Sequence, residues 1–409
     1  MNAFASRSAR TAAALCLACA MSGGAVQPAL AAPNAGPPDR SSIQGCAPPP
    51  TVTDGAIPWA QLQLAPQRVW KVTRGQGVVV AVVDSGVDPN SPQLAGSVLP
   101  GKAVSGAADS DCSGQGTFVA GIIAAKQVHG IGFAGIAPEA RILPVRVLDG
   151  QGNGDPGMLA KGIRIAADSG ARVINVSTTT SQPSADLESA VAYARSRDAL
   201  VVAAAAKGGD DGSVTYPAAY QGVLAVGAVN ETGQPGAYAE TGASVELVAP
   251  GEGVVSIGPG GPGHWQGSGA AYATPFVSAT AALVRAYRPE LNADQVAQRL
   301  LATANPSGGT VPDPDTGWGM VNPYAAVTAA VAAGGADARP GGGAVERVEH
   351  PVVPAPDPTP GRIVVVTAAS AVVLGVVTWL ISVLVPAGRR RGWRPARKVV
   401  VADGATEHR

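Results

Sequence analysis

Six short apolar runs, separated by helical patterns, constrain the fold of this chain more than any other feature. The first, residues 77–88, reads GVVVAVVDSGVD and ends in turn residues. Five runs of the same type follow, at residues 140–149, 171–178, 199–206, 222–229 and 244–251. Such uninterrupted apolar runs are typical of parallel strands that helices cover on both faces. Helical patterns lie between and after them, at residues 117–126, 157–170, 185–198 and 274–289. We therefore predict an α/β fold, with a doubly wound, mostly parallel sheet flanked by helices.

The first 31 residues have the features of a secretion signal. Arg7 and Arg10 precede an apolar stretch, and Ala-Leu-Ala at residues 29–31 forms a cleavage site of the A-x-A type, so we expect cleavage after Ala31. The alternative is an N-terminal membrane helix, which is disfavoured because polar residues, glycines and a proline interrupt the run at residues 22–28. Residues 32–57 are rich in Pro, Gly and Ser, which predicts an N-terminal extension unable to fold alone.

An uncharged apolar run, IVVVTAASAVVLGVVTWLISVLV, occupies residues 363–385. Its length suits a bilayer core of about 30 Å. Arginines and a lysine cluster directly after it, at residues 389–398, and positive flanks stay in the cytoplasm. We predict a single transmembrane helix over 362–386, a basic cytoplasmic tail over 387–409, and an exported domain outside the cytoplasm at the cell membrane. A buried core helix is the alternative, but such a helix rarely stays apolar on all sides over this length.

The remaining chain divides into a predicted domain over residues 58–333 and a Pro/Gly-rich linker over residues 334–361. The formal net charge is zero at pH 7, so charge gives no attraction to nucleic acid. No cluster of residues has metal-ligand spacing, and we predict neither a metal nor another cofactor.

The cysteines predict one disulfide. Cys16 and Cys19 lie in the predicted signal, which leaves Cys46 and Cys112 in the exported chain. In an oxidising compartment an even pair of cysteines usually forms a bond. We predict a Cys46–Cys112 disulfide, with two free thiols as the alternative.

Three segments carry a family resemblance. VVDSGVD at residues 82–88, GQGTFVAGIIAA at 114–125 and GAAYATPFVSATAALV at 269–284 resemble, in order, the Asp, His and Ser blocks of subtilisin-like serine proteases. The framework segments GFAGIAPEARILPVRVLD and TGWGMVNPYAAV also match, so the resemblance covers about residues 58–333. It implies the subtilisin fold for that domain.

The chain looks most like the mycosins, which are membrane-anchored subtilisin-like proteins of actinobacterial type VII secretion systems. The start of the domain, the extension before it, and the cysteine ahead of the second block carry this resemblance, as do the Pro-rich linker, the single span and the basic tail. One departure is that mycosins commonly carry a second cysteine pair in the domain, for which no cysteines remain here.

Sites in open α/β sheets lie at the carboxyl ends of strands, where the sequence puts Asp84 and Lys207. The resemblance identifies Asp84 as the residue that orients the catalytic base. It puts Gln115 at the position of the base histidine and Ala271 at the position of the nucleophilic serine. Lys207 takes the position of the oxyanion asparagine, and NVSTTT at residues 175–180 replaces the usual N-x-S-L-G of the substrate-lining strand.

These substitutions predict a pseudoprotease. Glutamine takes up no proton near neutral pH, and alanine carries no nucleophile. Losing the serine or the histidine of such a triad lowers turnover by about a million-fold, and losing the oxyanion asparagine lowers it by about a hundred- to a thousand-fold. We expect the Gln115 amide to donate a hydrogen bond to Asp84, so that the buried carboxylate stays paired.

A relocated Ser–His pair is the competing chemical hypothesis. His264 lies a few residues before the third block, with Ser268 nearby and Ser278 one turn further along the predicted helix. The interpretation we favour places His264 in a polar loop. We expect His129 in a turn or on the surface.

The favoured function is a membrane-anchored scaffold that stabilises a type VII secretion complex, with a groove that can still take an extended peptide. One alternative is a divergent serine endopeptidase with a relocated base or nucleophile. Another is a regulator of an active paralogue.

Overall fold

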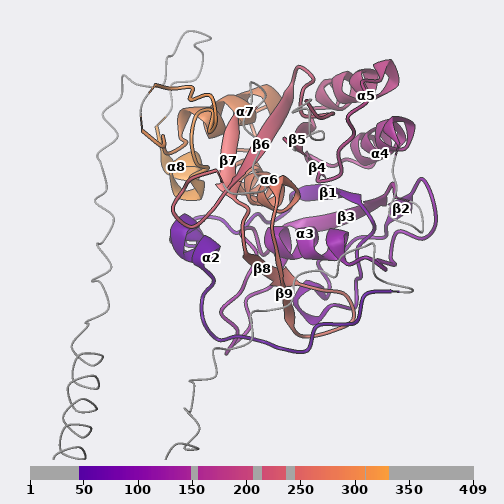
Figure 1. The fold of residues 1–409 in the computed structure, drawn as a ribbon, viewed down its shortest axis with the longest axis vertical. Helices are drawn as coiled ribbons and strands as arrows, with labels where there is room; N and C mark the ends of the chain where they lie inside the picture. Colours follow the sequence, from indigo (N-terminus) through magenta and orange to yellow (C-terminus); the bar gives the residue numbers. More distant parts are fainter. Residues whose placement is uncertain (1–45, 149–154, 206–213, 236–244, 309, 331–409) are drawn as a thin grey trace, which may run out of the picture. The chain divides into compact units, whose positions relative to one another are not determined.

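A seven-stranded parallel sheet forms the centre of the molecule, in the order β2-β3-β1-β4-β5-β6-β7 (Figure 1). The strands are β1 (Val79–Asp84), β2 (Lys102–Ala103), β3 (Arg141–Arg146), β4 (Val173–Val176), β5 (Leu200–Ala204), β6 (Val223–Val229) and β7 (Leu247–Pro250). Each predicted run contains one of these strands, and only the two-residue β2 lies outside the predicted runs. All neighbouring pairs are parallel. The predicted parallel sheet is confirmed.

The computed structural model describes residues 46–148, 155–205, 214–235, 245–308 and 310–330. The predicted signal, linker, transmembrane helix and tail lie outside these residues, and so does Lys207. Within the described ranges, no helix is long and apolar enough to cross a membrane.

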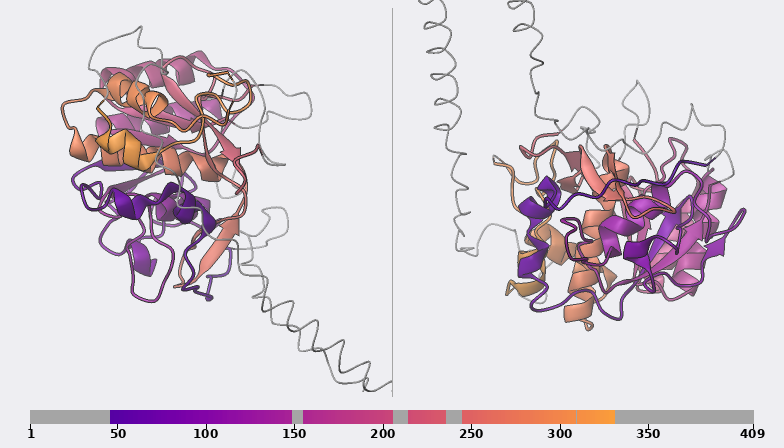
Figure 2. Two further views of the ribbon diagram at one scale, coloured as in Figure 1. Left: turned by 90° about the vertical axis from the view of Figure 1, so that its left-hand side faces the viewer. Right: turned by 90° about the horizontal axis from the view of Figure 1, so that it is seen from below.

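Helices cover both faces of the sheet (Figures 1 and 2). The helices are α2 (Trp59–Leu64), α3 (Gln115–Ala124), α4 (Pro156–Asp168), α5 (Ala185–Ser196), α6 (Ala270–Tyr287), α7 (Ala293–Ala302) and α8 (Pro323–Thr328), with short 3-10 helices η2 (Pro66–Arg68) and η3 (Pro92–Leu94). On one face α4 packs against α5, and a Cβ on its Gly162 would touch the side chains of Val83 and Val145. On the other face α3 packs against α6. The four predicted helices are confirmed as α3, α4, α5 and α6.

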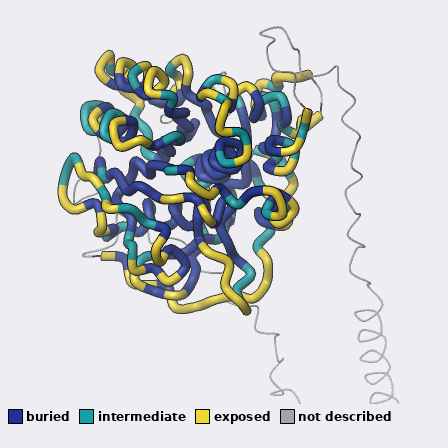
Figure 3. Tube along the Cα trace, turned by 180° about the vertical axis from the view of Figure 1, so that it is seen from behind, coloured by how far each residue is buried: buried dark blue, intermediate teal, exposed yellow. Residues whose placement is uncertain are grey.

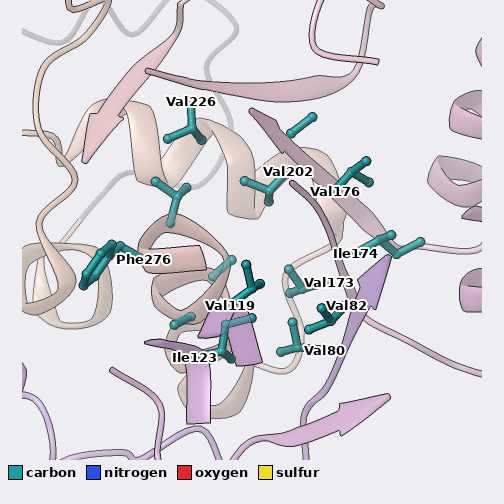
Figure 4. Packing of buried hydrophobic residues seen from close by; sticks show 14 of the residues in the cluster. Val80, Val82, Val119, Ile123, Val173, Ile174, Val176, Val202, Val226 and Phe276 are labelled. Atoms are coloured by element: carbon teal, nitrogen blue, oxygen red, sulfur yellow. The ribbon is translucent and has the colours of Figure 1, made fainter. Parts of the chain in front are cut away.

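The core lies on both faces of the sheet, and one part of it fills the space between the sheet and the pair α3 and α6. Figure 4 shows Val80 and Val82 of β1 beside Val119 and Ile123 of α3, with Phe276 of α6 in the same cluster. Successive strand residues point to opposite faces, so Val82 and Val83 each serve one of the two helical layers. The central strands and α6 are buried, while the outer faces of the peripheral helices are exposed (Figure 3).

A separate antiparallel hairpin, β8 (Val254–Ile257) and β9 (His264–Gly267), lies against α3. Ser256 donates a hydrogen bond to the Phe118 carbonyl at 2.7 Å. A Cβ on Gly121 would approach Ile257 to 2.5 Å, so the glycine allows helix and hairpin to meet. The sequence patterns did not predict this hairpin.

The described part of the N-terminal extension, residues 46–57, runs along the hairpin. The carbonyls of Pro50 and Val52 accept hydrogen bonds from the amides of Gly263 and His264 at 3.0 and 2.9 Å. The Cys46–Cys112 disulfide is present, with an S–S distance of 2.05 Å, which confirms that prediction. The bond attaches the extension to the loop directly before α3.

One buried arginine attaches the end of the described chain to the rest of the fold. Arg299 of α7 is 5% exposed. Its guanidinium donates hydrogen bonds to the carbonyls of Ala326, Val327 and Ala329, at the end of α8. A cation suits the exposed carbonyls of a helix carboxyl end.

Candidate functional site

Asp84 ends β1 with its side chain fully buried. Neighbouring β3 and β4 lie on opposite sides of β1, so this carboxylate sits where the chain switches direction across the sheet. Its Oδ1 accepts the Ser85 amide at 2.7 Å, and its Oδ2 accepts Nε2 of Gln115 at 3.1 Å. The predicted hydrogen bond from Gln115 to Asp84 is confirmed.

Asp111 fixes the start of α3, the helix that carries Gln115. This buried carboxylate accepts hydrogen bonds from the amides of Gly114 and Thr117 at 2.8 and 2.7 Å, where α3 begins. It also accepts the Ser85 hydroxyl at 2.8 Å. A negative charge at the amino end of a helix is favourable. Because the Asp111 carboxylate bonds both Ser85 and the start of α3, it also connects α3 to the end of β1. Sequence reasoning missed Asp111, although an acidic residue just before a helix is a known start signal.

The glycines around Gln115 allow the start of α3 to approach both the turn after β1 and strand β9 closely. A Cβ on Gly116 would lie 1.9 Å from the carbonyl oxygen of Gly86. Gly114 has φ +78°, and a Cβ there would meet the ring of Trp265 at 2.3 Å. Close packing therefore explains the two glycines of the GQG sequence, whether or not the site is catalytic.

Ala271 is the second residue of α6, and a chain of buried polar groups holds its backbone. Its carbonyl accepts the Ser177 hydroxyl at 2.8 Å, just beyond the end of β4. Asn175 donates to that hydroxyl at 2.9 Å and accepts from Ser278 at 2.8 Å. The helix start that carries Ala271 is therefore tied to the same edge of the sheet as Asp84.

The amino ends of α3 and α6 meet through aromatic rings. Phe118 of α3 and Tyr272 of α6 pack edge to face, with ring centroids 4.7 Å apart. Asp84, Gln115 and Ala271 thus lie on elements that converge at the carboxyl edge of the sheet, whereas Lys207 lies outside the described residues. Among the residues that the structure describes, the buried hydroxyl of Thr178, next to Ser177, has no hydrogen-bond partner. In the described part of the chain, no group of three or more His, Cys, Asp or Glu side chains could hold a metal ion.

His264 corrects one expectation. It lies in strand β9 and is 3% exposed, so the prediction of a polar loop is wrong. The prediction failed because strand β9 is short and directly follows a Gly/Pro tract that is typical of an irregular loop. Its Nε2 is 2.9 Å from Oε1 of Gln93. Because the Gln93 amide nitrogen donates to two carbonyls, Oε1 is the acceptor and Nε2 of the imidazole carries the hydrogen.

Within the described ranges, His264 forms no relocated Ser–His pair. Ser268 accepts a hydrogen bond from the Gly253 amide, and Ser278 donates to Asn175. The imidazole packs edge to face on Phe133, and its buried Nδ1 has no hydrogen-bond partner in the described part of the chain. His129, in contrast, is exposed in a turn, as predicted.

Burial of His264 should make stability depend on pH. Desolvation lowers the pKa of His264 from 6.5 to about 4, and the Asp54 carboxylate opposes this only in part. Between these values the unfolded chain binds a proton that the folded protein does not. The free energy of unfolding should therefore fall by about 3 kcal/mol as the pH falls from 6.5 toward 4.

Urea unfolding at pH 7 and pH 4.5 measures this effect. His264→Gln keeps an N–H donor for Gln93 and should lose most of this pH dependence. His129→Gln, at an exposed histidine, is the matched control and should keep it. Equal pH dependence in the two variants would contradict the assignment.

Comparison with known proteins decides the family. The model of the Subtilase family, peptidase S8, matches residues 75–319, which is more than half of the chain. The chain belongs to the subtilase family. The matched segment contains Asp84, Gln115, Lys207 and Ala271.

Among subtilases, this chain is similar to the mycosins. Mycosin-3 of Mycobacterium tuberculosis (strain ATCC 25618 / H37Rv) is 35% identical over 404 residues, covering 83% of this chain and 86% of that protein. The crystal structure of MycP1 from Mycobacterium smegmatis has a TM-score of 0.63 at 31% identity, and the match covers 71% of this chain and 90% of that one. The structure of the MycP3 protease from the type VII (ESX-3) secretion system has a TM-score of 0.63 at 33% identity, covering 75% and 100% of the two chains. This subtilase is therefore a mycosin-like protein related to type VII secretion proteases.

Proposed function

We propose that this subtilase is a pseudoprotease that acts as a membrane-anchored, stabilising component of a type VII secretion system. The observation that carries the proposal is the pair of Asp84 and Gln115, together with Ala271 at the start of α6. In an active subtilase, a base and a nucleophile would occupy positions 115 and 271.

The chemistry of these side chains supports loss of catalysis. The Gln115 amide nitrogen donates to Asp84, and a carboxamide accepts no proton from an attacking hydroxyl near neutral pH. Ala271 offers a methyl group in place of a nucleophile. Lys207, at the proposed oxyanion position, replaces a short amide with a long, flexible ammonium stem. Asp84 then serves as a structural carboxylate.

The relatives and the sequence support a location at the membrane, in a type VII secretion system. Mycosin-3 matches over most of both chains, and MycP3 is a protease from a type VII secretion system. The apolar run and the arginine cluster after it favour one membrane span over 362–386, with the basic tail in the cytoplasm and the folded domain exported. The proposed partners are components of the secretion membrane complex, together with extended peptide segments that bind the groove expected of this fold.

A deletion strain of the source organism tests the scaffold role. Deletion should abolish secretion and dissociate the core membrane complex on native gels. Wild-type protein and Asp84→Asn should both restore secretion, because the role needs no catalysis, whereas a chain truncated after Gly361 should fail. Unimpaired secretion and an intact complex in the deletion strain would reject the scaffold. Rescue by the wild type but not by a folded Asp84→Asn variant would instead favour a divergent peptidase.

A further inference from the structure

A recess of about 200 Å³ lies at the amino edge of the sheet, opposite the edge that holds Asp84. The first residues of β5 and β6 form one side of it, and Glu246, directly before β7, forms another. One face of α7 and the end of α5 complete the wall. Parallel strands put their amino ends on one edge, so this recess is separate from the candidate active site.

The floor of the recess is apolar. Leu200, Val223 and Leu224 line it and are each at most 5% exposed. Ala297 and Leu301 of α7 add apolar wall. Such a surface suits an aliphatic stem, which gains from burial against it.

Two of the three charged side chains at the recess neutralise each other. Arg195 and Asp294 form a bidentate pair, with both N–O distances 2.8 Å. The guanidinium is thus already matched by a carboxylate of the same wall.

Of the three charged side chains that line the recess, Glu246 has no cationic partner among the described residues. No ion pair among the described residues includes it. Its Oε2 accepts one hydrogen bond, from the Ala225 amide at 3.3 Å. Burial raises the pKa of Glu246, since desolvation outweighs that hydrogen bond. A half-buried carboxylate of this kind favours a neighbouring cation.

We infer that this recess binds a primary alkylammonium group, either the lysine side chain of a partner protein or a small free amine. The ammonium would pair with Glu246, and the methylene stem would lie on the leucine and valine floor. This assignment does not depend on whether the proteolytic site is active.

The same features disfavour other ligands. The negative charge of the Glu246 carboxylate would repel an anion. An uncharged apolar ligand would desolvate Glu246 further without compensating its charge. A metal ion needs more oxygen ligands than this single free carboxylate provides.

Binding of n-butylammonium to the full chain in detergent tests the inference, measured by saturation-transfer NMR titration. We expect saturable binding, and n-butanol of the same length should bind about tenfold or more weakly, because it lacks the charge. Glu246→Gln can still accept the Ala225 amide and should weaken n-butylammonium binding by a similar factor. Glu188→Gln, at an exposed carboxylate of α5, is the matched control and should bind as the wild type does.

A substitution that fills the recess without changing its charge provides a second test. Ala297→Met should abolish binding while leaving Glu246 in place. No saturable binding of n-butylammonium, equal affinity for n-butanol, or unchanged affinity in both Glu246→Gln and Ala297→Met would each overturn the inference.

A comparison of two amines distinguishes the sources. Nα-acetyl-lysine amide carries the same ammonium stem on a peptide backbone. If it binds as tightly as n-butylammonium, the ligand is a partner's lysine side chain. If only the free amine binds, the recess takes a small molecule.

Discussion

The triple variant Gln115→His/Lys207→Asn/Ala271→Ser is expected to gain peptidase activity at least about a thousand-fold above that of the wild type, which should be inert. The reason is that the frame of the site persists: Asp84 already binds the side chain at position 115, and Ser177 already holds the backbone of residue 271. Losing one triad member costs about a million-fold, so restoring the set should recover part of that factor. Cleavage of a peptide library and labelling by a serine-directed phosphonate measure the gain.

Controls separate chemistry from folding. Each single substitution should stay inert, because triad members act as a unit. Adding Asp84→Ala to the triple variant should remove the gained activity. Measurable hydrolysis by the wild type would reject the pseudoprotease proposal. An inert triple variant with wild-type stability would show that the substrate groove has also degenerated.

Removing the Cys46–Cys112 disulfide should lower the free energy of unfolding by about 4 kcal/mol. The bond joins residues 66 apart in sequence, and a cross-link of that span restricts the unfolded chain by about this amount. Urea unfolding of the oxidised protein, the reduced protein and the Cys46→Ser/Cys112→Ser variant measures the loss.

The backbone contacts of the extension provide the internal control. Its carbonyls at Pro50, Val52 and Asp54 bind the hairpin and the loop after α3 without the sulfur bridge. If the double variant loses less than about 1 kcal/mol, these hydrogen bonds alone hold the extension, and the predicted role of the disulfide is wrong. Proteolysis within residues 47–57 should accelerate in the variant if the prediction holds.

The parallel sheet could be predicted because its strands carry a strong local signal. Val79–Asp84 and Val223–Val229 are almost entirely buried apolar runs bounded by turn residues. The helix α3 was likewise readable from its small apolar residues. The helix predicted at residues 274–289 begins four residues after the observed start of α6, because Pro275 lies inside α6, whereas a proline usually marks the first turn of a helix.

The hairpin β8–β9 could not be read in the same way. Its strands are four residues each, and the tract GPGGPG between them resembles an irregular loop. Its stability comes from α3 and from the extension, both distant in sequence. Helix α7 was also not predicted, although Asn292 and Gln295 form a capping box at its start.

The contacts of the candidate site also fall into two groups, those that the sequence predicts and those that only the folded chain reveals. The pairing of Asp84 with Gln115 followed from the chemistry of a buried carboxylate, and the structure contains it. The support from Asn175 and Ser278, and the recess around Glu246, depend on residues about a hundred positions apart that only the folded chain brings together. Sequence patterns describe local periodicity and carry little information about such contacts.

Arg299 links the end of the described chain to helix α7, and this link has a mechanical consequence. On a chain anchored downstream in a membrane, as proposed, tension reaches the domain at the end of α8. The guanidinium grips three carbonyls there, and its own helix, α7, packs on β5. A force applied at the end of α8 is therefore transmitted to α7 and the central sheet before α8 detaches from the fold. Such an attachment suits a domain whose work is to stay in place under strain.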